Sequence, residues 1–332
     1  MTSATGVDAL GEWVRTAYGL GDGPLARTPG GRGAEAVVWR LEVGHEAFAL
    51  KQPFVAREEV GLAREAALLD HFAAAGVEVP THRVACDGRY AAGLPAALGG
   101  GQVRLTHWVE GAAPGSGTRA LARPLGTLLA HLHRCAPPTH EQPVAWYTTT
   151  PTEGDWAELA RSAVDRPWGE RLGARLGDLA AYARLVERAG PGAGPWVVGH
   201  RDLHPDNVVV APDGSLRALD WEDAGPVDPS RELAKVLAQW HIDGDRIDEQ
   251  AVRATVAAYR EGGGTGTVRG QEDLALWLCG ETNYLARQAR LALDPATSAD
   301  RRPHAETDIG LLLTSYLPPL HVLDSLVEVA RG

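Results

Sequence analysis

The sequence predicts an α+β protein with two lobes: a small, β-rich amino-terminal lobe and a larger, mostly helical carboxyl-terminal lobe. Short β-rich runs separated by turns dominate the first 110 residues, whereas segments of helical periodicity dominate the rest. A β-hairpin near residue 210, rich in Asp and Asn, interrupts those helices. At 332 residues, the chain is long enough for both lobes.

A glycine-rich turn is predicted between the first two strands. It spans residues 28–35, includes Gly31 and Gly33, and follows a short predicted helix over residues 8–19. Glycine allows backbone N–H groups to come close to phosphate oxygens. The turn therefore has two interpretations, a phosphate contact or an ordinary connection between strands.

A lysine and a glutamate of the first lobe are predicted to pair. Lys51 ends a predicted strand, and the helix after it has an apolar stripe at helical spacing. Glu65 lies within that stripe, and a carboxylate on a buried face needs a partner. We expect Lys51 to be this partner, with Glu58 as the alternative carboxylate. The competing interpretation is that Glu65 lies at the edge of the stripe and reaches solvent. The stripe consists of Leu62, Ala66, Leu69 and Phe72.

The first lobe is predicted to end at residue 110. The run from Val103 to Gly111 is typical of a strand followed by a linker, and the next residues, up to Gly117, are rich in Gly, Ala and Pro. We therefore divide the chain into residues 1–110 and residues 111–332.

The most informative stretch is His-Arg-Asp-Leu-His-Pro-Asp-Asn, residues 200–207. Two β-rich runs follow it, joined by a Pro-Asp-Gly turn, and Asp220 comes directly after the second. An antiparallel hairpin brings Asn207 and Asp220 to the same end of its strands, with Asp202 just upstream. An Asp that accepts a hydroxyl proton, together with an Asn and an Asp that hold Mg²⁺, is the constellation that phosphoryl transfer needs. The alternative is a polar loop whose side chains merely cap turns.

This spacing matches the catalytic loop and the metal-binding Asp of the protein-kinase fold. The variant found here, with Leu-Asp-Trp-Glu-Asp around Asp220, resembles the aminoglycoside phosphotransferase family more than protein kinases, which have Asp-Phe-Gly at that point. That family usually has His-Gly-Asp-Leu-His-x-x-Asn followed by Ile-Asp-Trp. Arg201 stands where the family usually has Gly, and Asp206 stands where Gly is common. Neither change removes a chemical group.

The resemblance implies a protein-kinase-like fold and ATP- or GTP-dependent phosphorylation of a small-molecule hydroxyl. Asp202 would orient the hydroxyl and accept its proton, while Asn207 and Asp220 would hold Mg²⁺. Lys51 would position the nucleotide phosphates and Glu65 would hold Lys51. His200 is expected to hydrogen-bond the backbone and fix the shape of the loop. The remaining nucleotide contacts are assigned to Gly31 and Gly33 in the turn and to the linker residues Thr106, His107 and Trp108.

The sequence says less about the acceptor molecule than about the other parts of the predicted reaction. The family implies that carboxylates and aromatics from the carboxyl-terminal helices line the acceptor site. Glu222 and Asp223 follow the metal-binding Asp, while Trp277 and Glu281 are four residues apart on a late predicted helix, residues 271–293. An amphipathic packing helix with solvated acids explains the latter pair equally well. Of the ten tryptophans, those considered as stacking partners for an acceptor ring are Trp146, Trp221 and Trp277.

The amino-acid composition limits which classes of molecule the protein is expected to bind. The formal net charge of −11 argues against general nucleic-acid binding and is compatible with a cationic acceptor such as an aminoglycoside. Apolar runs are too short for a membrane span, and no secretion signal is recognised at Met1, so a cytoplasmic enzyme is expected. A metabolite kinase acting on choline, homoserine or a sugar would share the same motifs. A non-catalytic pseudokinase is the remaining alternative, although it would normally have lost Asp202, Asn207 or Asp220.

Overall fold

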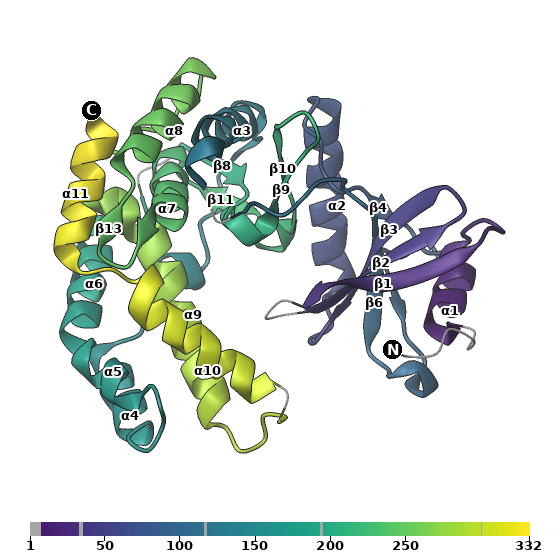
Figure 1. The fold of residues 1–332 in the computed structure, drawn as a ribbon, viewed down its shortest axis with the longest axis horizontal. Helices are drawn as coiled ribbons and strands as arrows, with labels where there is room; N and C mark the ends of the chain where they lie inside the picture. The colour runs from purple at the N-terminus through teal and green to yellow at the C-terminus, as the bar shows by residue number, and fades with distance from the viewer. Residues whose placement is uncertain (1–7, 33–35, 116–117, 193–194, 300) are drawn as a thin grey trace. The chain divides into compact units, whose positions relative to one another are not determined.

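The computed structural model describes residues 8–32, 36–115, 118–192, 195–299 and 301–332. The chain divides into two compact units, Met1–Glu110 and Gly111–Gly332 (Figure 1). Gly33, one of the two glycines assigned to a phosphate contact, lies outside the described residues.

The first unit is built on an antiparallel sheet of six strands, in the order β1-β2-β3-β6-β4 with β5 also paired to β6. Two helices, α1 and α2, lie on opposite sides of this sheet (Figure 1). The elements are α1 (Ala9–Tyr18), β1 (Leu25–Arg32), β2 (Ala36–Val43), β3 (Glu46–Pro53), α2 (Glu59–Ala74), β4 (His82–Arg83), β5 (Ala91–Gly93) and β6 (Gln102–His107).

Alternation along the strands sends apolar side chains to one face of the sheet and charged ones to the other. Phe48 and Leu50 are buried against α1 in a core that includes Val14 and Tyr18. Lys51 is the next residue of β3, and it lies opposite Arg104 of β6. Cross-strand neighbours share a face, so Lys51 and Arg104 both belong to the face away from that core.

The second unit is mostly helical. Its α helices are α3 (Ala122–Cys135), α4 (Glu153–Ser162), α5 (Gly169–Ala174), α6 (Leu176–Ala189), α7 (Pro229–His241), α8 (Glu249–Glu261), α9 (Ala275–Leu293), α10 (Arg301–Leu311) and α11 (Leu320–Arg331). Its short strands are β7 (Pro138–Thr139), β8 (Trp196–Gly199), β9 (Val208–Val210), β10 (Leu216–Ala218), β11 (Gly225–Val227), β12 (Ile242–Asp243) and β13 (Arg246–Ile247). Within the described residues, no helix is both long and apolar enough to cross a membrane.

Two small antiparallel pairs flank the predicted catalytic loop. β8 leads into the loop and pairs with β11, while β9 leads out of it and pairs with β10 in the predicted hairpin. The backbone N–H of Leu219 donates to the carbonyl of Asn207 over 2.8 Å. The hairpin therefore places Asn207 and Asp220 at the same end, and this prediction is confirmed.

The carboxyl-terminal helices differ from the predicted ones at their ends. The helix expected over residues 271–293 begins as a 3₁₀ turn, Gln271–Leu274, and becomes α-helical only at α9. The last segment is broken by a π-helical turn, Leu312–Tyr316, followed by Pro318 and Pro319. Proline lacks the N–H that a continuing helix needs, so a new helix, α11, starts after it.

Candidate active site

His200 shapes the catalytic loop, as predicted. Its Nδ1 accepts from the backbone N–H of Asp202 over 3.3 Å, and its Nε2 lies 2.8 Å from the carbonyl of Leu219. The second contact requires a proton on Nε2, so this pattern selects the neutral Nε2–H tautomer. Burial lowers the pKa of His200, which keeps the ring neutral. The loop is thereby tied to the residue that precedes Asp220.

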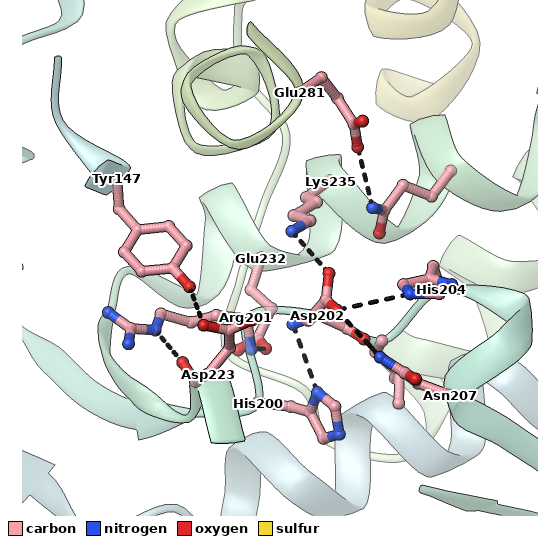
Figure 2. A network of polar contacts seen from close by, with 12 residues as sticks. Tyr147, His200, Arg201, Asp202, His204, Asn207, Asp223, Glu232, Lys235 and Glu281 are labelled. Carbon is pink, nitrogen blue, oxygen red and sulfur yellow. Dashed lines mark hydrogen bonds and ion pairs between the residues drawn. The ribbon is translucent and has the colours of Figure 1, made fainter. Parts of the chain in front are cut away.

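Asp202 lies at the centre of a network of side chains from the loop and from α7 (Figure 2). Its Oδ1 lies 3.2 Å from Nζ of Lys235. Its Oδ2 accepts from Nδ2 of Asn207 over 2.9 Å and lies 3.4 Å from Nε2 of His204. Burial alone would raise the pKa of Asp202, but the charge of Lys235 and the hydrogen bond from His204 lower it well below its ordinary value. Asp202 is therefore a carboxylate at neutral pH.

Asn207 and Asp220 have the chemistry of a magnesium site. The amide nitrogen of Asn207 donates to the backbone carbonyl and to the carboxylate of Asp202, which turns the amide oxygen away from Asp202. Asp220 is exposed at the end of the hairpin and has a left-handed backbone, φ 52°. One carboxylate and one amide oxygen match the way Mg²⁺ binds in nucleotide enzymes, where phosphates and waters complete its shell.

Helix α7 positions the loop, and this is what the sequence reasoning missed. Glu232 accepts from the backbone N–H of Arg201 over 2.5 Å and from Nε2 of His133 over 3.0 Å. A Cβ on Gly199 would lie 2.0 Å from Oε2 of Glu232, so that carboxylate can approach the loop only beside a glycine. Glu232 and Lys235 are charged residues among apolar helix positions, and this was the available sequence signal.

The departure at Arg201 has a structural explanation. Arg201 has a φ of 63°, in the left-handed region that glycine adopts without strain, which accounts for the usual glycine. Its side chain makes compensating contacts: Nε donates to the carbonyl of Asp223 over 2.5 Å, and the guanidinium lies 3.9 Å from the ring centre of Tyr147. The Tyr147 hydroxyl donates to Asp223 over 2.7 Å, which closes the cluster (Figure 2).

Glu65 is buried in the first unit, as predicted, but its described partners were not anticipated. Oε1 accepts from Nη1 of Arg104 over 2.8 Å and lies 3.3 Å from Nε2 of His82, while Oε2 accepts from Nη1 of Arg57 over 2.6 Å. Burial raises the pKa of Glu65, but the hydrogen bond from His82 and the two guanidinium charges bring it down to about 2. The pairing of Lys51 with Glu65 stays a prediction.

Strand pairing changes the nucleotide contacts that were expected from Gly31 and from the linker residues. Gly31 lies within β1, opposite Val38 of β2, rather than in a separate turn. In the linker, the N–H of His107 donates to the carbonyl of Thr81 over 2.8 Å, and the N–H of Trp108 donates to that of Ala47 over 2.9 Å. These two amides are already used within the lobe. An adenine contact at this edge therefore needs carbonyl groups or a residue beyond Trp108.

The residues predicted for the acceptor have different surroundings. Glu281, on α9, faces α7 and accepts from Nε2 of Gln239 over 3.1 Å (Figure 2). Asp223 is exposed and accepts from Tyr147, and Glu222, beside it, is half-buried. Trp277 is only 1% exposed, so its ring packs in the interior and has no face open for stacking. It is a core residue because apolar neighbours surround its position on α9.

Comparisons with known proteins identify the family and the fold of this chain. A family model described as "Phosphotransferase enzyme family" matches residues 27–271. A search of curated proteins returned no match. Among solved structures, spectinomycin phosphotransferase bound to ADP and spectinomycin is similar to this chain, with a TM-score of 0.61 and 14% identity over 99% of this chain and 100% of that one.

Two further solved structures have the same fold. Amicoumacin kinase, in complex with AMP-PNP, Ca²⁺ and its ligand, has a TM-score of 0.57 and 14% identity over 92% of this chain and 93% of that one. A microcompartment-associated aminopropanol kinase has a TM-score of 0.57 and 17% identity over 92% and 94%. The predicted α+β, protein-kinase-like fold is confirmed.

Proposed function

Because this chain belongs to the phosphotransferase enzyme family, a family of small-molecule kinases that act on hydroxyl groups, we propose that it transfers the γ-phosphoryl group of ATP or GTP to a hydroxyl of an amino-bearing small molecule. The preferred acceptor is an aminoglycoside or a similar antibiotic. The observation that supports transfer chemistry is the convergence of Asp202, Asn207 and Asp220 around one loop and one hairpin.

In this proposal, Asp202 orients the acceptor hydroxyl and receives its proton as the oxygen attacks the γ-phosphorus of ATP or GTP. The bond from that phosphorus to the β–γ bridging oxygen breaks, and ADP or GDP leaves. Asn207 and Asp220 would hold the Mg²⁺. When bound, this ion supplies positive charge that offsets the charge on the phosphates. Lys51 positions the nucleotide phosphates, and Glu65 belongs to the charged face that orders Lys51. His200 keeps the loop closed around Asp202.

Glu281 supports a cationic acceptor. Its carboxylate accepts a hydrogen bond from the neutral amide of Gln239, and burial raises its pKa. Glu281 is half-buried, and a carboxylate that is partly removed from water is stabilised by a cation; an ammonium group of the acceptor would serve. The net charge of −11 also attracts cationic molecules. We assign Glu281 to the acceptor amine, with the exposed Asp223 and its neighbour Glu222 as further candidates.

A metabolite kinase is the second candidate. The similarity to an aminopropanol kinase favours it, because a small amino alcohol has both an amine and a hydroxyl, the two groups that the proposed site would recognise. Both candidates therefore predict the same two recognition elements, Glu281 for the amine and Asp202 for the hydroxyl. They differ in the size of the acceptor.

A screen for acceptor-dependent ATP consumption tests the proposal. Purified protein with Mg·ATP is offered aminoglycosides and other antibiotics, small amino alcohols, and neutral sugars, and the product mass is measured. We expect a gain of one phosphoryl group on an amine-bearing acceptor, with a KM that rises with salt as charge attraction is screened. A neutral acceptor with a salt-independent KM would overturn the cationic assignment. If no acceptor is phosphorylated, the transferase proposal fails.

A further inference from the structure

Helix α7 contacts three consecutive residues of the catalytic loop. Glu232 accepts from the N–H of Arg201, Lys235 pairs with the carboxylate of Asp202, and Nε1 of Trp240 donates to the carbonyl of Leu203 over 2.8 Å. The first and last of these contacts hold the backbone. Of these three α7 residues, Lys235 is the one that contacts the carboxylate of Asp202, the group that would react.

Lys235 is unusual in this chain. The sequence has 32 basic residues of the Lys and Arg type, and only two of them, Lys51 and Lys235, are lysines. Arginine has a planar, forked head, whereas lysine has a compact ammonium on a flexible stem. In a chain that otherwise uses arginine, a buried lysine marks a place where the compact charge fits. The other lysine is the residue already assigned to the nucleotide phosphates.

The burial of Lys235 is costly unless its charge is compensated. Its side chain is 5% exposed, and Asp202 is its ion-pair partner at 3.2 Å. Asp202 keeps 27% of its side chain exposed, so the pair is sealed on the lysine side and open on the carboxylate side. A pair that served stability alone has no need of this open edge.

We propose that Lys235 is a positioning residue for phosphoryl transfer. It holds Oδ1 of Asp202 from the interior, while Asn207 and His204 contact Oδ2, so the carboxylate presents one orientation to the acceptor hydroxyl. The ammonium also offsets the negative charge of Asp202, which would otherwise repel the approaching phosphoryl group. This inference rests on the proposed function, since it assigns Lys235 a role in that reaction.

Kinetics of two substitutions test the role. Lys235→Met removes the charge and keeps the length, and Lys235→Arg keeps the charge with a different shape. We expect kcat per folded molecule to fall at least 30-fold in Lys235→Met, with the affinity for Mg·ATP changed less than threefold, and an intermediate kcat in Lys235→Arg.

The matched control is Arg231→Met. Arg231 is a buried cation of the same helix, but it donates to the carbonyls of Ala189 and Gly190.

We expect Arg231→Met to lower stability and to leave kcat per folded molecule within threefold of wild type. An unchanged kcat in Lys235→Met would overturn the positioning role. An equal loss in both variants would also overturn it, because the effect would then follow from removal of any buried cation of α7. If Lys235→Met does not fold, Lys235→Gln and Lys235→Arg give the same comparison.

A second measurement does not depend on the acceptor. With two lysines in the chain, protein labelled with ¹³C at the lysine ε carbon gives two side-chain NMR signals, which the Lys51→Arg and Lys235→Arg variants assign. In Asp202→Asn the Lys235 signal should move and the Lys51 signal should stay. A Lys235 signal that does not respond would refute the contact, even if the transferase activity is real. If the contact holds but wild-type protein phosphorylates no acceptor, the proposed function fails instead.

Discussion

Glu65 in the first unit and Asp202 in the second are both carboxylates surrounded by hydrogen-bond donors, yet they have different exposure. Glu65 has Arg104, Arg57 and His82 around it and keeps 7% of its side chain exposed. Asp202 has Lys235, Asn207 and His204 around it and keeps 27% exposed.

The difference in exposure separates a carboxylate that serves structure from one that is proposed to react. The partners of Glu65 include two guanidinium groups, one from a strand and one from the loop before α2, and only 7% of its side chain is exposed. Asp202 is held by one cation from the interior and by loop residues at its side. A reacting group must meet its substrate, and its contacts therefore fix orientation without covering it.

The largest expected effect comes from Asp202→Asn. The substitution keeps size and removes the acceptor of the hydroxyl proton, so kcat should fall by about 10² to 10⁴-fold. Circular dichroism and Mg·ATP binding should remain close to wild type. Turnover measured on an accepted substrate, within a factor of about three of wild type, would contradict the assignment.

Glu65→Gln should change stability more than chemistry. It removes the negative charge that pairs with buried Arg104, and removal of one partner of a buried pair typically costs about 3 to 5 kcal/mol. Chemical denaturation at pH 7 measures the loss. The control is Glu58→Gln at the exposed residue before α2, which should change the free energy of unfolding by less than about 0.5 kcal/mol.

The same variant has a pH signature. Folding depresses the pKa of Glu65 to about 2, so its stabilising contribution is fully present above the unfolded value of about 4.3 and is lost as pH falls toward 2. The gap in unfolding free energy between wild type and Glu65→Gln should therefore be constant above about pH 5 and narrow below it. A gap that is as wide at pH 3 as at pH 7 would exclude this account.

A smaller effect is expected from Asp220→Ala. With this carboxylate removed, neutral Asn207 remains as the assigned protein ligand, so Mg²⁺ should no longer tighten ATP binding, a loss of at least about 1.4 kcal/mol, or tenfold. Calorimetry with and without Mg²⁺ measures it. The control is Asp206→Ala, which removes an equal charge next to Asn207, at a side chain that is 92% exposed. This variant should leave the affinity unchanged. Equal affinities in wild type and Asp220→Ala would rule out the metal assignment.

The smallest effect separates two substitutions of Arg201 in the loop. Arg201→Ala and Arg201→Gly both lose the contacts to Asp223 and Tyr147, but only glycine relieves the left-handed φ of 63°. Arg201→Gly should therefore be more stable than Arg201→Ala by about 1 kcal/mol. Thermal unfolding of the pair measures the difference. Equal stabilities would mean that the backbone at Arg201 carries no strain.

Much of the architecture could be predicted from the sequence because local patterns carry it. The hairpin after residue 207 follows from two β-rich runs and a Pro-Asp-Gly turn, and the burial of Glu65 follows from its place in a helical stripe. The motif around Asp202 was recognisable because its residues lie within eight positions of one another. In the same way, local spacing predicted the role of His200 in shaping the loop.

The sequence by itself predicted which residues would carry the proposed chemistry, Asp202, Asn207 and Asp220, because short-range spacing and side-chain type are the basis of that prediction. Only the tertiary structure decided what surrounds them. Lys235 lies 33 residues from Asp202, and Arg104 lies 39 residues from Glu65. No local period encodes such pairings. They arise when helices and strands pack, and each buried charge is then stabilised by the opposite charge or hydrogen-bond donor that the packing brings within reach.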